Sequence, residues 1–209
     1  MNDLTTTTEN EVSANDPAAA YRNLADEAGG GGDFLKFKKG KFVKGSNDEE
    51  APLGTRYAVN MIGLERGYIK FSVEPPEKRM ARPSEPKITR ESLGETDDSL
   101  WEKDDNGNPQ DPWTPTWEIP LRDIGTGEEL VFATSSTGGI NALGRLCSAY
   151  VNRLAMGGHA VPIIALGASS YKHKRFGDVD VPTLRILSWQ KEEDLVAGKA
   201  DGLDDQIPF

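Results

Sequence analysis

Residues 140–154 carry a helical pattern of apolar side chains, and patterns typical of β-strands flank it on both sides. The apolar positions share one helical face and are Ile140, Leu143, Leu146, Cys147, Tyr150, Val151 and Leu154. Gly157-Gly158 predicts the end of the helix, and the Ser/Thr/Gly run at 135–139 predicts its N-terminal cap. That run lacks the Gly-Lys-Ser/Thr of a P-loop, so capping is favoured over anion binding. A single helix among strands indicates a mostly β fold.

The strand patterns are short stretches in which apolar and polar residues alternate. They cover residues 34–45, 55–61, 67–73, 117–122, 129–134, 161–167 and 179–189, and residues 123–128 predict a hairpin turn. Tyr57, Val59 and Met61 are expected to share one face. In 67–73 the expected apolar face is Ile69, Phe71 and Val73, opposite Tyr68, Lys70 and Ser72. Strands with one helix between them suit an OB-like barrel, which closes about five strands, often with a helix at one end, and binds single strands across an open face.

Composition divides the chain into three parts. Residues 1–32 are polar, acidic and end in four glycines, so we expect a disordered acidic arm. Residues 33–190 are expected to form the folded domain, with an irregular Pro-rich insertion at 74–120, and residues 191–209 form an acidic tail. Trp101, Trp113 and Trp117 are expected to fix the insertion to the core, since three tryptophans are costly to leave in water. Asp104-Asp105-Asn106-Gly107 predicts a turn and not a calcium loop.

The acidity of the chain belongs mostly to its ends. The formal net charge is -10, of which residues 1–32 carry -5 and residues 191–209 carry -4, leaving -1 for residues 33–190. The middle of the chain is therefore free to present a basic face in spite of the net charge.

Several classes of site and location are not expected. Cys147 is the only cysteine, which excludes an intrachain disulfide and a cysteine-based zinc site, and with two histidines no metal or other cofactor is predicted. No apolar run approaches membrane-spanning length, and residues 1–5 lack the layout of a signal peptide. We expect a cytoplasmic protein.

Two segments combine lysines with aromatic rings, as single-strand binding surfaces do: lysines contact phosphates and rings stack on bases. The first segment contributes Lys36, Phe37, Lys38, Lys39, Lys41 and Phe42. The second contributes Tyr171, Lys172, His173, Lys174, Arg175 and Phe176, and Tyr68 with Lys70 gives weaker support. The competing interpretation of the first segment is an edge strand whose lysines prevent aggregation. Two such segments in a nearly neutral domain favour nucleic-acid binding.

The last six residues, Asp204-Asp205-Gln206-Ile207-Pro208-Phe209, join an acidic run to an apolar end. They resemble the C-terminal tip of bacterial single-stranded DNA-binding proteins, which implies docking on replication and repair enzymes. In such docking Ile207, Pro208 and Phe209 would enter an apolar pocket while Asp204 and Asp205 meet basic residues on its rim. The alternative is an acidic tail that only adds solubility. Segments 34–37 and 170–174 also resemble phage and prophage proteins of DNA metabolism.

These patterns predict a non-enzymatic single-stranded DNA-binding protein of bacterial or phage replication, recombination and repair. Its expected partners are single-stranded DNA and enzymes that bind acidic Ile-Pro-Phe tails, with no membrane contact and the oligomeric state left open. One rival is an adaptor that binds no DNA and captures a host repair enzyme through the tip. The other is a metal-dependent nuclease using Asp97, Asp98, Asp104 and Asp105, which lack the spacing of a known motif.

Overall fold

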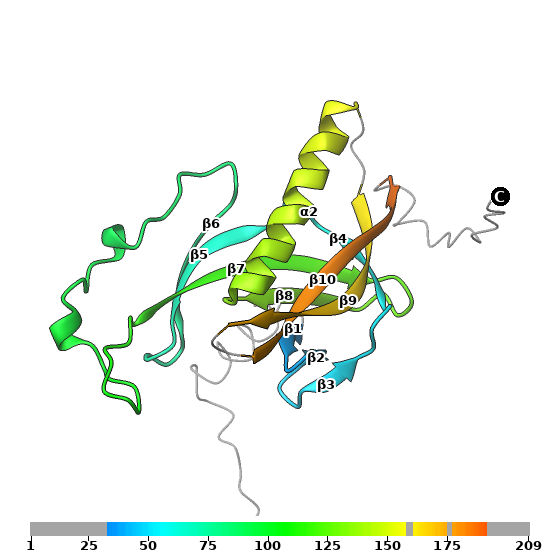
Figure 1. Cartoon of the computed structure of the whole chain (residues 1–209). Coiled ribbons are helices and arrows are strands. Elements are labelled where there is room, and N and C mark those ends of the chain that lie inside the picture. Colours follow the sequence, from blue (N-terminus) through cyan, green and yellow to red (C-terminus); the bar gives the residue numbers. More distant parts are fainter. Residues whose placement is uncertain (1–32, 158–160, 175–176, 192–209) are drawn as a thin grey trace, which may run out of the picture. The chain divides into compact units, whose positions relative to one another are not determined.

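The computed structural model describes residues 33–157, 161–174 and 177–191, all within one compact unit that spans residues 32–209 (Figure 1). The predicted disordered arm 1–32 and nearly all of the acidic tail lie outside the described residues. The described residues form ten strands, one α-helix and two short 3-10 helices, η1 (Glu91–Leu93) and η2 (Asp98–Leu100). The prediction of a mostly β fold with one helix is confirmed.

One sheet contains all ten strands. In chain order they are β1 (Asp33–Lys38), β2 (Lys41–Lys44), β3 (Glu49–Ala51), β4 (Arg56–Val59), β5 (Glu65–Lys70), β6 (Glu77–Ala81), β7 (Trp113–Asp123), β8 (Glu129–Thr134), β9 (Val161–His173) and β10 (Gly177–Gln190). The spatial order is β10-β9-β4-β7-β8-β1-β2-β3, with β5 also paired to β7 and β6 to β5. Within the described chain the end strands β3 and β10 do not pair, so the sheet is not closed.

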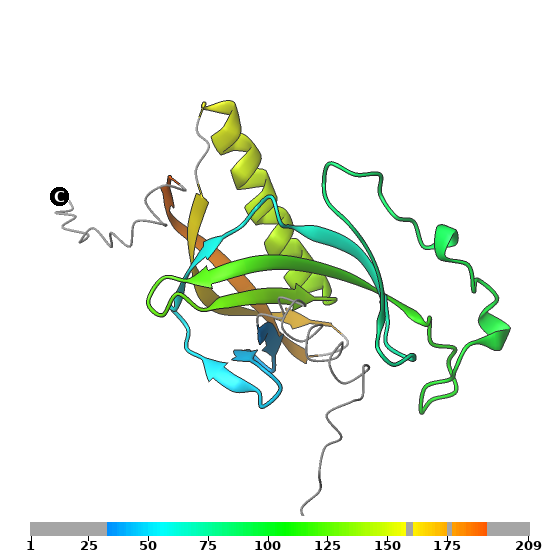
Figure 2. The ribbon, with the colours of Figure 1, turned by 180° about the vertical axis from the view of Figure 1, so that it is seen from behind.

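The central strand β7 organises this sheet. One edge of β7 pairs with β8, and the other pairs first with β5 and then with β4 (Figure 2). The β7–β8 turn is closed by hydrogen bonds from the backbone N–H groups of Gly125 and Thr126 to the Asp123 carboxylate, at 2.7 and 3.0 Å. The predicted hairpin around residues 123–128 is therefore confirmed, because an Asp side chain at this position satisfies the turn's free N–H groups.

One hydrophobic core draws on both halves of the sheet. Leu35 and Phe42 come from β1 and β2, Ile119 and Phe132 from β7 and β8, and Ile164 from β9, and each is fully buried. The alternation in β1 places Leu35 in this core and leaves Lys36 exposed, as the period-two pattern predicts.

The face shared by Tyr57, Val59 and Met61 is also confirmed, since all three are buried in the core. The apolar face predicted for residues 67–73 is wrong beyond Ile69: β5 ends at Lys70, and Phe71 is 61% exposed in the turn that follows. Alternation cannot show where a strand ends, so the pattern ran past the turn.

The helix α2 (Thr137–Ala155) begins three residues before the apolar pattern and ends one residue after it. Ala142, Leu143 and Leu146 form its buried face. The N-cap is Ser136, whose Oγ accepts a hydrogen bond from the backbone N–H of Gly139 at 3.1 Å, which confirms the predicted capping role. After the helix, Gly157 adopts a φ of 82°, a conformation that favours glycine. No helix in the described ranges is long and apolar enough to cross a membrane.

Ser136→Ala is expected to destabilise the protein by about 1 kcal/mol, because the N–H of Gly139 loses its acceptor. Urea unfolding followed by circular dichroism measures this loss. Ser136→Asp, which keeps an acceptor, serves as the control and is expected to retain most of the stability. Equal losses in both variants would contradict the capping role.

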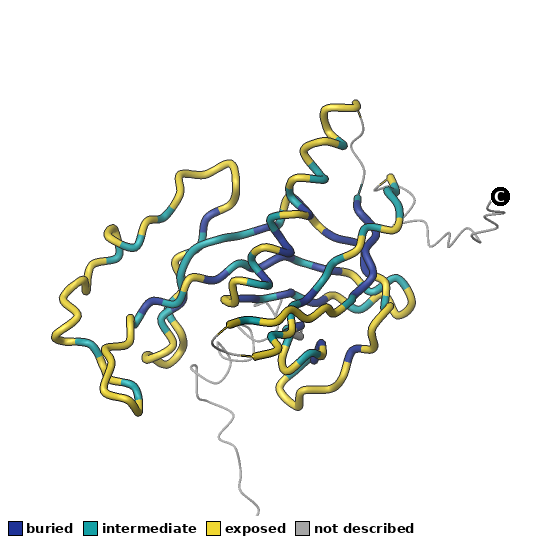
Figure 3. The backbone as a smooth tube through the Cα atoms, viewed as in Figure 1, coloured by how far each residue is buried: buried dark blue, intermediate teal, exposed yellow. Residues whose placement is uncertain are grey.

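The predicted irregular insertion is shorter than 74–120. Residues 77–81 form β6 and residues 113–120 belong to β7, so the irregular segment is 82–112, most of which is exposed (Figure 3). Trp113 is buried and Trp117 packs against the core, both from β7, whereas Trp101 belongs to the irregular segment. Two of the three tryptophans therefore belong to the sheet itself, and only Trp101 acts within the segment.

Glu95 ties segment 82–112 to the sheet. Its carboxylate accepts hydrogen bonds from the Lys70 ammonium and, at 2.9 Å, from the Trp113 indole, and these bonds lower the pKa of Glu95. The Glu95 carbonyl accepts from the Trp101 indole at 2.7 Å. Arg90 lies over the Trp101 ring and bonds Asp111 at 2.7 Å, which raises the pKa of Arg90. The expectation that tryptophans hold this segment in place fits these contacts, with Glu95 as their shared acceptor.

Candidate nucleic-acid interface

The turn between β1 and β2 presents the first lysine cluster. Lys36 and Lys38 point away from the core because they alternate with Leu35 and Phe37. Lys39 and Gly40 form the turn with φ values of 48° and 80°, and Lys39 is exposed. A tight turn therefore holds the lysines of this cluster on one short hairpin.

Phe42 is not available to a nucleic acid, and its prediction as a DNA-binding residue is wrong. The side chain is fully buried, with its ring centroid 5.0 Å from that of Phe37 and 5.9 Å from that of Phe132. Phe37 is half-buried and packs against the same core. The lysine–phenylalanine alternation places both rings on the inner face, because the apolar face of a strand turns towards the core.

Acidic neighbours pair with part of the first cluster. Lys38 bonds Asp48 and Lys41 bonds Glu50, each at 2.7 Å, and both pairs are about half exposed. Lys44 bonds Glu128 at 3.0 Å, which raises the pKa of Lys44. Exposed pairs of this kind contribute about 0–1 kcal/mol, so a phosphate can replace the carboxylates at little cost. Within the described residues no ion pair engages Lys36 or Lys39.

The edge-strand interpretation still applies to the end of β1 that carries the lysines. In the strand order β1 lies between β8 and β2, but β8 pairs only with residues 33–35. The stretch with Lys36 and Lys38 is paired on one side, with β2. Protection of this short free edge and contact with a ligand therefore both remain open as explanations for these lysines.

The second cluster lies at the tip of the hairpin formed by β9 and β10. Tyr171 is 51% exposed, Lys172 and Lys174 are exposed, and His173 is half-buried with its ring 6.4 Å from that of Tyr171. Both lysines are without an ion pair among the described residues. The predicted site residues Arg175 and Phe176 lie outside the described residues.

The fold brings the two clusters together. Gly40, in the β1–β2 turn, lies so close to β10 that an added Cβ would be 2.9 Å from the Asp180 carboxylate oxygen. Asp180 pairs with Ser170, and the next residue pair towards the hairpin tip joins Val179 to Tyr171. Lys39 and the backbone of Tyr171 therefore lie near one contact point although they are 132 positions apart in the sequence, and the Tyr171 side chain points to the face of the hairpin opposite Asp180. Figure 1 shows β1 beside the tip of the β9–β10 hairpin.

Tyr68 and Lys70 are not brought to these clusters. They pair with Pro115 and Trp113, which share a face of β7 with the buried residues Ile119 and Leu121. Lys36 points to the opposite face, and Lys70 is only 17% exposed and paired with Glu95. The prediction that groups Tyr68 and Lys70 with the β1 lysines is therefore wrong. Alternation shows which residues of one strand share a face, but not which faces of two strands lie on the same side of the sheet.

Phe34 is a neighbouring aromatic residue that the prediction did not include. The ammonium groups of Lys36 and Lys78 lie 5.9 and 5.2 Å from the centre of its ring, and Lys78 also bonds Glu118 at 2.9 Å. Phe34 belonged to the alternating pattern, so its sequence position was a usable signal. Its proximity to Lys78, on β6, depends on the folding of the sheet and has no local signal.

The carboxylates of the nuclease alternative serve local structure. Asp97 accepts hydrogen bonds from Ser99, and Asp104 accepts from Asn106 and Asn108, as the predicted turn requires. These bonds lower the pKa values of both aspartates. In the parts of the chain that the structure covers, no three Cys, His, Asp or Glu side chains lie in an arrangement that would hold a metal ion.

The predicted partner-binding residues Asp204, Asp205, Ile207, Pro208 and Phe209 lie outside the described residues. Comparisons of the chain with protein-family models, curated proteins and solved structures find no match. The functional argument therefore depends on the residues of this chain and on how the fold places them.

Proposed function

We propose that residues 33–190 bind single-stranded DNA and that the acidic tail recruits replication or repair enzymes. The observation that carries this proposal is the meeting of the two lysine clusters at Gly40 and Asp180. Lys39, Lys172 and Lys174 are exposed there without ion pairs in the described chain, and Tyr171, next to Lys172 on β9, exposes its ring on the other face of the hairpin. Unpaired cations suit contact with the phosphate backbone, and an accessible ring at the same hairpin tip suits base stacking.

In this proposal the sheet is an open, OB-like barrel. Its support is that strands from both ends of the sheet share one core and that the β1–β2 turn reaches β10. Lys36, Lys38 and Lys41 extend the phosphate-binding surface from the contact point along the first hairpin. Asp178 and Asp180 on β10 keep phosphates away from their own part of the β9–β10 hairpin, because carboxylates repel phosphates.

The recruiting role rests on the tail sequence, which joins Asp204 and Asp205 to Ile207-Pro208-Phe209. Such a segment offers apolar side chains for a pocket and carboxylates for a basic rim. The chain therefore combines a binding domain with a tail that brings enzymes to the coated strand.

Fluorescence anisotropy with labelled oligo-dT tests the proposal on the full chain and on a chain that ends at Gln190. Both chains are expected to bind. With about six phosphate contacts, a plot of log affinity against log salt concentration should have a slope of about -4. Duplex DNA of the same length is the control competitor and should displace the oligonucleotide poorly. Absence of binding by both chains would contradict the proposal and favour the adaptor that acts through the tip alone.

A further inference from the structure

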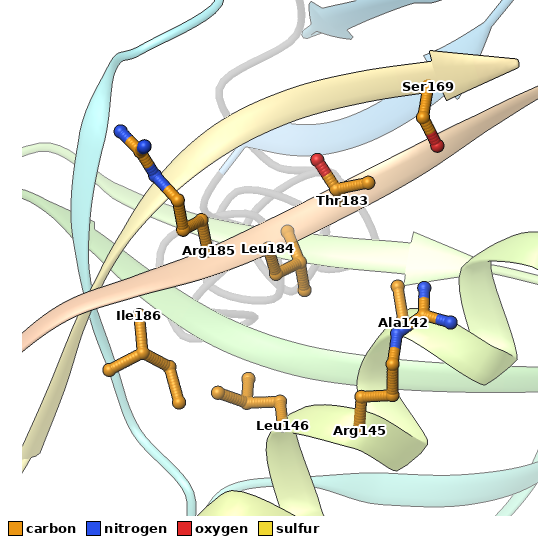
Figure 4. A pocket seen from close by; sticks show the side chains of 8 residues that line it. All are labelled: Ala142, Arg145, Leu146, Ser169, Thr183, Leu184, Arg185 and Ile186. Carbon is orange, nitrogen blue, oxygen red and sulfur yellow. The ribbon is translucent and has the colours of Figure 1, made fainter.

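The seam where α2 runs beside β10 carries positive charge without any acid. Gly138 contacts Val181 near the start of the helix, and Tyr150 stacks on Trp189 near its end with ring centroids 6.3 Å apart. Neither α2 nor residues 181–191 contain Asp or Glu, whereas together they contain Arg145, Arg153, Arg185 and Lys191. Figure 4 shows Arg145 beside a cavity between the two elements and Arg185 turned away from α2. In a chain of net charge -10, two neighbouring segments with four cations and no acid are a marked local reversal.

None of these four cations forms an ion pair within the described residues. The Arg153 guanidinium lies 5.9 Å over the Trp189 ring, and its buried Nε has no hydrogen-bond partner in the described structure. The seam therefore has positive charge that the described part of the fold leaves uncompensated.

Apolar side chains line the cavity in this seam. It has a volume of about 460 Å³, and Leu146 of α2 and Leu184 and Ile186 of β10 line it. Figure 4 shows Leu184 and Ile186 of β10 on the same side as Leu146 of α2, with Arg145 beside them. The seam thus offers apolar side chains with arginines at the rim.

We infer that this seam is the docking site of the chain's own tail, with Ile207 and Phe209 in the cavity and Asp204 and Asp205 against Arg145 and Arg153. Residues 192–209 hold six acids and one base, so their charge complements that of the seam. The tail leaves the described structure at Lys191, two residues after Trp189. Its eighteen residues reach up to about 60 Å when extended, whereas the 19-residue α2 is about 28 Å long.

Two other occupants fit the seam less well. Nucleic acid needs accessible rings, but Trp189 packs against Tyr150 and Arg153, and the apolar side chains that line the cavity are aliphatic. A second copy of the chain that docked through the same seam would bring Arg145 and Arg153 against their own equivalents, which repel one another. The tail has the opposite charge and, because it is tethered, an effective concentration of about millimolar.

This inference rests on the proposed function for its consequence: a docked tip is withheld from the enzymes it recruits. An enzyme with a basic-rimmed pocket must then compete with the seam, so recruitment depends on the difference between two affinities. DNA binding at the Gly40–Asp180 contact uses other residues and does not require the seam.

Hydrogen exchange of the full chain gives the first test. In the tip variant Ile207→Ser/Phe209→Ser, amides of residues 145–157 and 183–191 are expected to exchange about threefold or more faster than in the unmodified chain, because the docked tail no longer protects them. Amides of β7 are the internal control and should not change. Equal exchange of the seam in both chains would overturn the inference, as would seam protection that rises with protein concentration, which would indicate a second copy.

Binding in trans gives the second test. A labelled peptide of residues 198–209 is expected to bind the tip variant, and about tenfold more weakly when that variant also carries Arg145→Glu/Arg153→Glu. Arg122→Glu, an exposed arginine outside the seam, is the matched control and should leave peptide binding unchanged. Peptide binding that ignores the seam substitutions would overturn the inference. Loss of oligo-dT binding in Arg145→Glu/Arg153→Glu without loss of peptide binding would overturn it too, and would assign the seam to nucleic acid.

Oligo-dT binding measured on the same samples separates the two proposals. If the peptide binds the seam but no variant binds oligo-dT, the docking inference stands and the DNA-binding function fails. If oligo-dT binds but the peptide does not, the DNA-binding function stands and the docking inference fails.

Discussion

Replacing Lys39, Lys172 and Lys174 together by alanine is expected to weaken oligo-dT binding by about 100-fold at low salt. These three lysines flank the Gly40–Asp180 contact, and none of them forms an ion pair in the described chain, so a phosphate does not have to displace a bonded carboxylate. Loss of three phosphate contacts should also make the salt dependence of the affinity shallower by about two units in a log–log plot. Anisotropy titrations at four salt concentrations measure both quantities.

A second triple variant removes the same charge elsewhere. Arg82, Lys87 and Lys103 are exposed in or beside the irregular segment, away from the contact point, and their replacement by alanine should change the affinity by less than about threefold. An equal loss in both triple variants would show that net charge alone governs binding. No loss in the first variant would exclude the converged lysines as the binding surface.

Phe42→Ala is expected to destabilise the protein by about 3–5 kcal/mol, because a fully buried ring is lost from the core. The ring also contacts those of Phe37 and Phe132, so the cavity left behind is lined by aromatic groups that cannot easily close it. The midpoint of urea unfolding measures the loss. Phe42→Leu refills most of the volume and should recover much of the stability.

Tyr171→Ala, in contrast to Phe42→Ala, is expected to lower DNA affinity and to leave stability nearly unchanged. Its side chain is 51% exposed, so stability should change by less than about 0.5 kcal/mol. Oligo-dT affinity should fall by about 1–3 kcal/mol, the value of one base stack. A Phe42→Leu variant that stayed fully stable but lost DNA binding would contradict the assignment of Phe42 to the core.

Much of the local structure could be predicted from sequence. The patterns of residues 55–61 and 140–154 placed a strand and a helix in which Tyr57, Val59, Leu143 and Leu146 are buried as predicted. Val151 and Leu154 were expected on the same apolar helix face, but they are exposed, because the sheet does not cover that part of the helix. Asp123 and Ser136 marked a turn and a cap, because each side chain bonds N–H groups within three residues of itself. Signals of this kind are contained in a few consecutive residues.

For the candidate site, the sequence could predict the types of residue involved but not which of them lie together on the surface. The lysines of both segments are on the surface, but the pattern assigned Phe42 to DNA when it belongs to the core. It also grouped Lys70 with the β1 lysines, although Lys70 lies on the other face and pairs with Glu95. Alternation shows which residues share a face, and it cannot show what covers that face.

The sequence by itself determined the strand and helix faces, the turns, and the division into a nearly neutral domain with an acidic tail. Tertiary structure alone decided that Gly40 meets Asp180, that Lys78 lies beside Phe34, and that an acid-free seam forms between α2 and β10. The physical reason is range: backbone periodicity and capping act between near neighbours, whereas these contacts join segments that only strand pairing and core packing bring together.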